Sequence, residues 1–167
     1  MRNYFLKSYR YDPETYIGLG VQDLTGMDEL FPGKRFVQYP GGKFPFSDKA
    51  FDWVFSNAVV EHVGDDSAQI LFINEMMRVA KNVFFTTPNK YFPIESHTNV
   101  IFLHWNNALF YNRCKKYYPW ANRDSLYLLS FRRMRRLLET SNATSISLYK
   151  NRFVGIPMTF TVTCSDK

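Results

Sequence analysis

Short apolar runs alternate with polar loops along the chain, in an order that is typical of an α/β fold. Residues 16–21, 34–39, 51–55 and 82–88 are such runs, mostly bounded by Gly, Pro, Asn or Asp, and they predict four strands. A short helical segment is expected at 26–30. Because strands alternate with helical segments, we expect a mostly parallel sheet with helices on both faces.

The segment between the third and fourth strands has the periodicity of a helix. One helical face carries the apolar residues Ile70, Ile73, Met77 and Ala80. Asp66 and Gln69 have the spacing of an N-terminal capping box, and Asn82 suits the left-handed residue after the helix. Strand, helix and strand together have the length of a right-handed βαβ crossover.

A second helix is expected from Ser130, followed by two strands. Its apolar face consists of Phe131, Met134, Leu137 and Leu138. This spacing directs four arginines largely toward solvent, namely Arg132, Arg133, Arg135 and Arg136. Residues 144–150 and 155–165 predict an antiparallel strand pair at the C-terminal end.

Residues 89–124 differ in character from the rest of the chain. They are rich in aromatic residues, contain prolines and show little helical periodicity. An insertion of this kind at the carboxyl end of a strand is commonly a lid or a substrate-binding segment, which we expect here.

The composition fits one globular domain that spans residues 1–167, with 46% hydrophobic content. No apolar run reaches the about 18 residues of a membrane span, and no signal peptide is recognisable. We therefore expect a cytoplasmic protein with no membrane partner.

The net charge of +6 comes largely from residues 131–139. No nucleic-acid motif accompanies this charge, so no nucleic-acid partner is expected. Cys114 and Cys164 are expected to be reduced.

Candidate binding residues follow three of the predicted strands. Ligands of open α/β sheets bind outside the carboxyl ends of the strands, where this chain has Asp23, Pro40, Gly41 and the segment 57–59. Asp23 could accept hydrogen bonds from a ribose diol, or it could simply be a turn aspartate. The backbone at Pro40 and Gly41 could approach a flat ring, with Asn57, Ala58 and Val59 on its other side.

The stretch FPFSDKAFDWVFSNAVVEHV, followed by INEMMRVAKNVFFTTPN, resembles the middle of a class I S-adenosylmethionine-dependent methyltransferase. It is similar to the type 11 methyltransferases, related to those of ubiquinone and menaquinone biosynthesis. The matching residues, in order, are Pro45, Phe46, Asp48, Phe51, Asp52, Glu61, His62, Glu75, Arg78, Val79, Lys81, Pro88 and Asn89. The resemblance covers residues 16–98 closely and the C-terminal elements loosely.

This resemblance implies a Rossmann-like fold and a methyltransferase that uses S-adenosylmethionine on a small-molecule acceptor. It implies that Asp23, or Gln22 beside it, binds the cofactor ribose and that Pro40 and Gly41 lie near the adenine. The family normally has an aspartate where this chain has Pro40. The segment from Asn57 through Ala58 to Val59 would line the methionine part of the cofactor.

One motif of the family is missing from the sequence. The family begins its domain with a strand and a glycine-rich turn, but no GxGxG is present, and residues 2–9 would be the helix after that turn. Three explanations are open: the sheet closes differently, a homodimer compensates for the missing central strand, or the chain is a fragment of a longer protein.

The alternative function is that of a truncated or non-catalytic scaffold that does not bind the cofactor on its own. A nicotinamide-dependent oxidoreductase is disfavoured, because its phosphate-binding fingerprint is absent as well.

His62 and His97 are the candidate bases for methyl transfer, since imidazole titrates near neutrality. A simpler interpretation is that His62 and Glu61 hold the loop by hydrogen bonding. The residues expected to contact the acceptor are Asn89, Tyr91, Glu95 and His97. Glu95 and His97 with His104 could in principle bind a metal, but their spacing is not that of an established site, so no metal ligand is assigned.

Overall fold

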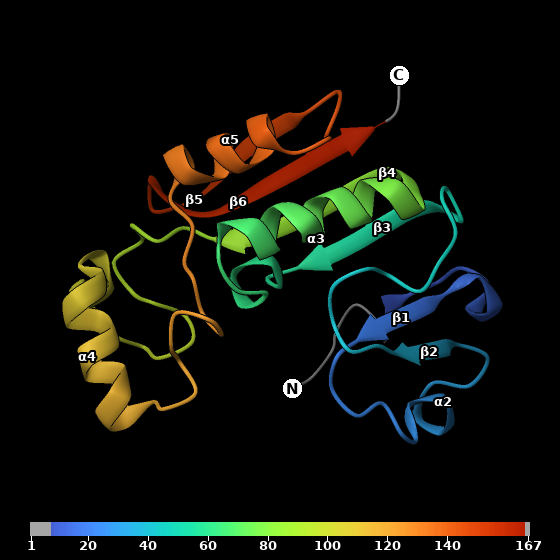
Figure 1. Cartoon of the computed structure of the whole chain (residues 1–167), viewed down its shortest axis with the longest axis horizontal. Coiled ribbons are helices and arrows are strands. Elements are labelled where there is room, and N and C mark those ends of the chain that lie inside the picture. The colour runs from blue at the N-terminus through green and yellow to red at the C-terminus, as the bar shows by residue number, and fades with distance from the viewer. Residues whose placement is uncertain (1–7, 166–167) are drawn as a thin grey trace. The chain divides into compact units, whose positions relative to one another are not determined.

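A computed structural model describes residues 8–165 (Figure 1). The chain divides after Pro45 into two compact units. The helix predicted at residues 2–9 lies largely outside the described residues. The single domain and the formation of a homodimer both remain predictions.

The first unit is built around a parallel pair of strands, β1 (Ile17–Gly20) and β2 (Arg35–Gln38). Their register pairs Ile17 with Arg35 and Gly20 with Gln38. Between them runs the short helix α2 (Met27–Leu30), and the 3-10 turn η1 (Pro13–Thr15) precedes β1. A Cβ at Gly18 would lie 2.7 Å from the ring of Phe36, so the close contact of β1 with this ring requires glycine. Both predicted strands and the helical segment are confirmed.

The second unit contains a four-stranded sheet. Its strands are β3 (Phe51–Asn57), β4 (Ala80–Pro88), β5 (Ser147–Phe153) and β6 (Ile156–Ser165), in the order β3-β4-β6-β5. β3 is parallel to β4, whereas β6 is antiparallel to both β4 and β5. The predicted parallel crossover and the antiparallel C-terminal pair are both confirmed, and with them the α/β fold class.

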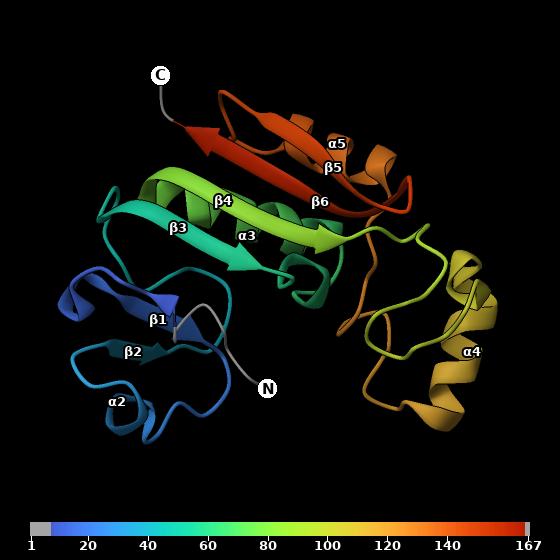
Figure 2. The ribbon, with the colours of Figure 1, turned by 180° about the vertical axis from the view of Figure 1, so that it is seen from behind.

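Two helices cover one face of this sheet, as the opposite views of Figures 1 and 2 show. They are α3 (Asp66–Val79) and α5 (Phe131–Thr140). Alternate strand residues point toward them and are buried, namely Val83, Phe85, Phe160, Val162 and Cys164. Met134, Leu137 and Leu138 of α5 are buried as predicted, and Ser130 caps the helix through a bond from the Arg133 amide.

Two details at the ends of α3 differ from the sequence predictions. The cap of α3 is Asp65, whose carboxylate accepts from the Ala68 amide, and not Asp66. The chain enters β4 directly at Ala80, so Asn82 is a strand residue and not a left-handed helix terminus. The reason is that Asn82 pairs with Trp53 of β3, and a paired strand residue keeps extended backbone angles.

Arg133 is the clearest correction. It does not point to solvent as its neighbours do, because its side chain is only 14% exposed. Its guanidinium forms an ion pair with Asp66, donates to Gln69 and to the carbonyl oxygens of Tyr127 and Leu128, and lies 3.5 Å from the centre of the Tyr127 ring. These acceptors come from α3 and from the loop before α5, so helical spacing alone could not reveal them.

Residues 89–124 contain more helix than the sequence indicated. The 3-10 turn η3 (Leu103–Trp105) leads into α4 (Asn107–Tyr117), which Asn106 caps. Phe110 and Cys114 of α4 are buried in a small core with Val100, Ala121, Leu126 and Leu128. None of the helices between residues 8 and 165 combines the length and apolar character that a membrane crossing requires.

Candidate functional site

The predicted cofactor residues of the first unit follow its two parallel strands. Gln22 and Asp23 come after β1, and Pro40 and Gly41 come after β2, so all four lie at the same edge of the strand pair. Asp23 accepts hydrogen bonds from the amide and the hydroxyl of Thr25, at 2.9 and 2.6 Å. These bonds lower the pKa of Asp23, and they show that it is a turn aspartate. Both end on Oδ1, and no further bond to Oδ2 is present in the described part of the chain.

The predicted cofactor residues of the second unit lie at the end of β3 and in the turn that follows it. The Asn57 amide oxygen accepts from the Thr86 hydroxyl at 2.5 Å, and the Ala58 amide donates to the Thr86 carbonyl at 3.0 Å. Ala58 has φ of +53°, a left-handed conformation that is unfavourable for any residue with a Cβ. Val59 then begins the 3-10 turn η2 (Val60–His62). β4 therefore holds Asn57 and Ala58 in place, and Ala58 is conformationally strained.

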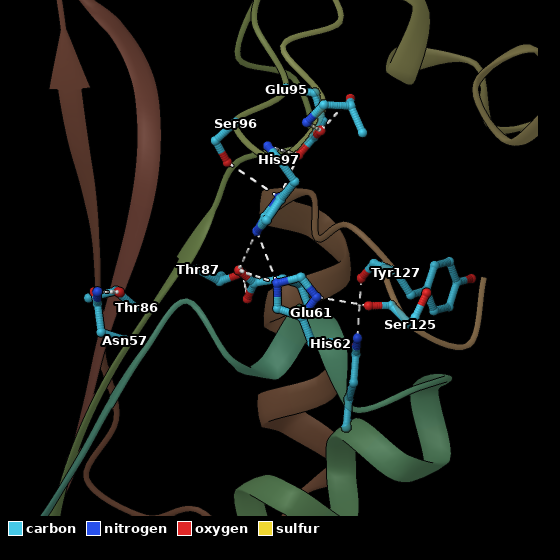
Figure 3. A network of polar contacts seen from close by, with 12 residues as sticks. Asn57, Glu61, His62, Thr86, Thr87, Glu95, Ser96, His97, Ser125 and Tyr127 are labelled. Atoms are coloured by element: carbon cyan, nitrogen blue, oxygen red, sulfur yellow. Dashed lines mark hydrogen bonds and ion pairs between the residues drawn. The ribbon is translucent and has the colours of Figure 1, made fainter. Parts of the chain in front are cut away.

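The structure brings together four polar side chains beside this turn (Figure 3). Glu61 and His62 lie on η2, and Glu95 and His97 lie in the loop after β4. Nε2 of His62 is 2.9 Å from Nε2 of His97. Oε1 of Glu61 lies 4.0 Å from the first of these nitrogens and 3.9 Å from the second. We call Glu61, His62 and His97 the histidine cluster.

The other nitrogen of each imidazole ring is fixed by a backbone or carboxylate oxygen. Nδ1 of His62 lies 2.8 Å from the Ser125 carbonyl oxygen, and Nδ1 of His97 lies 2.6 Å from Oε1 of Glu95. Both oxygens are acceptors, so each Nδ1 carries a hydrogen. His62 thus holds the loop by hydrogen bonding, as the simpler interpretation of the sequence indicated.

Glu95 is an ionised, fully bonded carboxylate. Besides the ring of His97 it accepts the amides of His97 and Thr98 and the Thr98 hydroxyl, at 3.0, 2.7 and 2.6 Å. Burial opposes ionisation, but the bonds from His97 and Thr98 outweigh it and lower the pKa of Glu95 to about 2. In return, Glu95 raises the pKa of His97 against the effect of burial.

Glu61 is in the opposite situation. Its side chain is completely buried, and one oxygen, Oε2, accepts from the Thr87 hydroxyl at 2.8 Å. The other oxygen, Oε1, has no hydrogen-bond partner among the described residues. Burial raises the pKa of Glu61, although the Thr87 bond and the two imidazoles act against this effect.

The remaining predicted acceptor residues lie apart from the histidine cluster. The side-chain amide nitrogen of Asn89 donates to the Pro157 carbonyl at 2.8 Å, a bond that joins the end of β4 to β6. The side-chain oxygen of Asn89 accepts from the backbone amide of Tyr91. Tyr91 is exposed and makes an edge contact with Trp105. His104 is buried and bonds through Nε2 to the Phe92 carbonyl, so it does not join Glu95 and His97 as a ligand.

Two contributors to this site were not predicted from the sequence. Thr87 is the last buried residue of β4, so its place at the carboxyl end of a strand could have suggested it. Ser125 contacts His62 through its backbone carbonyl from 63 residues away, and no side-chain pattern signals such a contact.

Residues 14–83 match the family model of a methyltransferase domain. The resemblance to the class I methyltransferases is confirmed. The matched segment includes all the predicted cofactor residues of this methyltransferase-like chain and the histidine cluster except His97. No curated protein sequence matches the chain.

Solved structures of S-adenosylmethionine-dependent methyltransferases share the fold. One from Methanosarcina mazei has 11% identity and a TM-score of 0.57, covering 89% of this chain and 80% of its own. One from Mesorhizobium loti has 12% identity and a TM-score of 0.58, covering 91% and 81%. A possible histamine N-methyltransferase from Thermotoga maritima has 12% identity and a TM-score of 0.57, covering 90% and 72%.

Proposed function

We propose that this chain is an S-adenosylmethionine-dependent methyltransferase that acts on a small-molecule acceptor. The observation that carries the proposal is the methyltransferase-domain match over residues 14–83. That segment contains β1, β2 and β3, whose carboxyl ends carry the candidate cofactor residues. When bound, the cofactor would supply an activated methyl group.

In each unit, taken by itself, the residues at the strand ends suit one part of such a cofactor. The unshared Oδ2 of Asp23 can accept a hydrogen bond from a ribose hydroxyl without disturbing the turn that Oδ1 makes with Thr25. Gly41, with φ of +94°, has no side chain to prevent approach of the adenine ring. Apart from its two chain neighbours, none of the described residues has an atom within 4 Å of the place a Cβ would take. Asn57 and Ala58 would contact the methionine part.

The acceptor would be bound by the loop after β4, through the exposed Tyr91 and the ring of His97. Glu95 and Asn89 would act by holding this loop in place, because their side chains are already bonded within the chain. A hydroxyl or carbon acid must lose a proton as it is methylated, and His62 or His97 would take it at Nε2. Their Nδ1 atoms are already bonded to Ser125 and Glu95, so Nε2 is the nitrogen that can act.

Calorimetric titration with S-adenosylmethionine, in a chelator-containing buffer, tests the proposal. We expect wild-type binding, and a loss of about 10-fold or more in affinity for Asp23→Asn, because a hydrogen bond to a charged group contributes about 1.5–3 kcal/mol. The asparagine retains Oδ1 for the turn. Asp12→Asn is a matched control, because Asp12 makes the same kind of turn with the Glu14 amide at 3.0 Å. Its affinity should stay at the wild-type value.

Absence of both heat and thermal shift at millimolar cofactor would contradict the proposal. It would favour the alternative, a methyltransferase-like scaffold that does not bind the cofactor on its own. Equal weakening by both substitutions would instead show that Asp23 acts only through the fold of the first unit.

A further inference from the structure

We propose that Glu61, His62 and His97 form a binding site for a divalent transition-metal ion such as Zn²⁺. One ligand atom from each residue lies within 4.8 Å of the other two. Two imidazole nitrogens and a carboxylate oxygen are a common donor set for zinc and similar ions. The inference concerns this cluster alone and does not depend on the methyltransferase proposal. An ion bound to both Nε2 atoms would prevent either histidine from acting as a base, so that role would belong to the metal-free chain.

The two imidazoles present lone pairs to each other. Because Ser125 and Glu95 keep a hydrogen on each Nδ1, a neutral ring has its lone pair on Nε2. The Nε2 atoms nevertheless face each other at 2.9 Å (Figure 3). Two lone pairs at this distance repel, so a positive centre must lie between or beside them. A metal ion and a shared proton are the two possibilities.

The unpartnered oxygen of Glu61 favours the metal ion. Oε1 is completely buried, has no hydrogen-bond partner among the described residues, and is directed toward both Nε2 atoms. A buried acceptor that remains unsatisfied destabilises the fold. A proton shared by the two rings would leave Oε1 unsatisfied, whereas a metal ion would bind all three atoms.

The distances require only a small adjustment. Ligand atoms on a tetrahedral zinc ion, about 2.0–2.1 Å from the metal, lie about 3.3 Å from one another. The present separations are 2.9, 3.9 and 4.0 Å. The rings would therefore move apart and Glu61 would move closer, each by less than about 1 Å.

The surroundings also match a metal site. The Glu95 carboxylate on Nδ1 of His97, and the Ser125 carbonyl on Nδ1 of His62, are the outer contacts that orient metal-binding histidines. The side chain of His62 is 32% exposed, which leaves a route from solvent. Three protein ligands leave a fourth position for water or for a ligand atom.

Metal binding should be measured on the full, untagged chain by competition between the protein and a chromogenic chelator for Zn²⁺. We expect one ion per chain for the wild type. His97→Ala should weaken binding by more than about 100-fold, since loss of an outer partner alone costs about 10–100-fold. Glu95→Gln should weaken Zn²⁺ binding by about 10–100-fold, because an amide oxygen is a weaker hydrogen-bond acceptor for Nδ1 of His97 than a carboxylate.

Controls separate the cluster from other possible ligands. The third histidine of the chain is His104, and His104→Asn should keep wild-type affinity, as should a Cys114→Ser, Cys164→Ser double variant. Circular dichroism in chelator establishes that each variant is folded. Imidazole nitrogen shifts in the wild-type NMR spectrum should move at Nε2, and not Nδ1, of His62 and His97 when Zn²⁺ is added.

Two outcomes would overturn the inference. One is no stoichiometric binding by the folded wild type, with a proton shared between the imidazoles in the NMR spectrum at neutral pH. The other is binding that persists in folded His62→Ala and His97→Ala variants, which would place the ion elsewhere.

Discussion

The Thr87 hydroxyl donates a hydrogen bond to Oε2 of Glu61 at 2.8 Å, and both side chains are completely buried. This bond joins the end of β4 to the 3-10 turn after β3. The amide of Tyr127 donates to the Glu61 carbonyl at 2.7 Å and attaches a third segment to the same residue. Glu61 is thus the point at which three parts of the chain are joined.

Replacing Thr87 with valine should therefore destabilise the protein. Valine keeps the branched shape but leaves Glu61 with no hydrogen bond to either oxygen, and we expect a loss of about 1–3 kcal/mol in the free energy of unfolding. Urea denaturation measures it. Thr163→Val is the control, because Thr163 is half-buried on the other face of the sheet, and its effect should stay within about 0.5 kcal/mol. Equal effects of the two substitutions would refute the role of the bond.

Arg78 holds the segment before β3 against α3. Its guanidinium binds both oxygens of Glu75, at 2.9 and 2.7 Å, and also donates to Asp48 and to the Phe46 carbonyl at 2.8 Å. Glu75 is buried. All four residues, Phe46, Asp48, Glu75 and Arg78, belong to the family motif, so this part of the motif stabilises the fold.

Arg78→Lys should cost about 1–3 kcal/mol, because an ammonium group cannot make the two parallel bonds to a buried carboxylate. The matched substitution is Arg135→Lys, at an exposed pair in which Arg135 lies 3.0 Å from Glu139. Exposed pairs contribute little, so about 0.5 kcal/mol or less is expected. Chemical denaturation of both variants gives the comparison, and a lysine tolerated equally well at both sites would contradict it.

The elements that the sequence predicted well have strong local patterns. β3 and β4 are apolar runs, and α5 has a buried face at helical spacing that begins after Ser130. Each pattern depends on residues that are close in sequence. The position of Asp23 after β1 and that of Asn57 at the end of β3 followed directly from the predicted strands.

The histidine cluster could not be predicted in this way. His62 and His97 are 35 residues apart, and His97 lies in a loop whose path depends on Glu95 and Thr98 and not on a periodic pattern. Arg133 was misplaced for a related reason, since Asp66 and Gln69 bind it from 67 and 64 residues away. Long-range polar contacts of this kind become visible only in the folded chain.

Ala58 offers a test of strain at the candidate cofactor turn. Its φ of +53° is unfavourable for alanine but not for glycine. Ala58→Gly should therefore raise the free energy of unfolding by about 0.5–1 kcal/mol, the reverse of the usual penalty for glycine. Ala68→Gly, within α3, should lower it by a similar amount. Thermal or urea denaturation should show changes of opposite sign in the free energy of unfolding of the two variants. Destabilisation of the protein by both substitutions would disprove strain at Ala58.

The raised pKa of Cys164 leads to a prediction of how the stability of the protein changes at high pH. Burial in β6 raises the pKa of its thiol from 9.0 to about 11, because the thiolate is poorly solvated there. Below the unfolded pKa the thiol is neutral in both states, and its contribution to stability is fully present. As the pH rises above about 9, the unfolded chain ionises first, so this contribution is lost progressively up to about pH 11.

Cys164→Ala should therefore flatten the fall in unfolding free energy between about pH 9 and about pH 11, measured by urea denaturation with a reducing agent present. Thr163→Ala removes the adjacent side chain of β6 without removing an ionisable group, so it should leave the slope unchanged. Alkylation supplies an independent measurement: native Cys164 should react much more slowly than the same thiol in urea. A wild-type slope in Cys164→Ala, together with rapid alkylation of the native chain, would show that the thiol is accessible and its pKa ordinary.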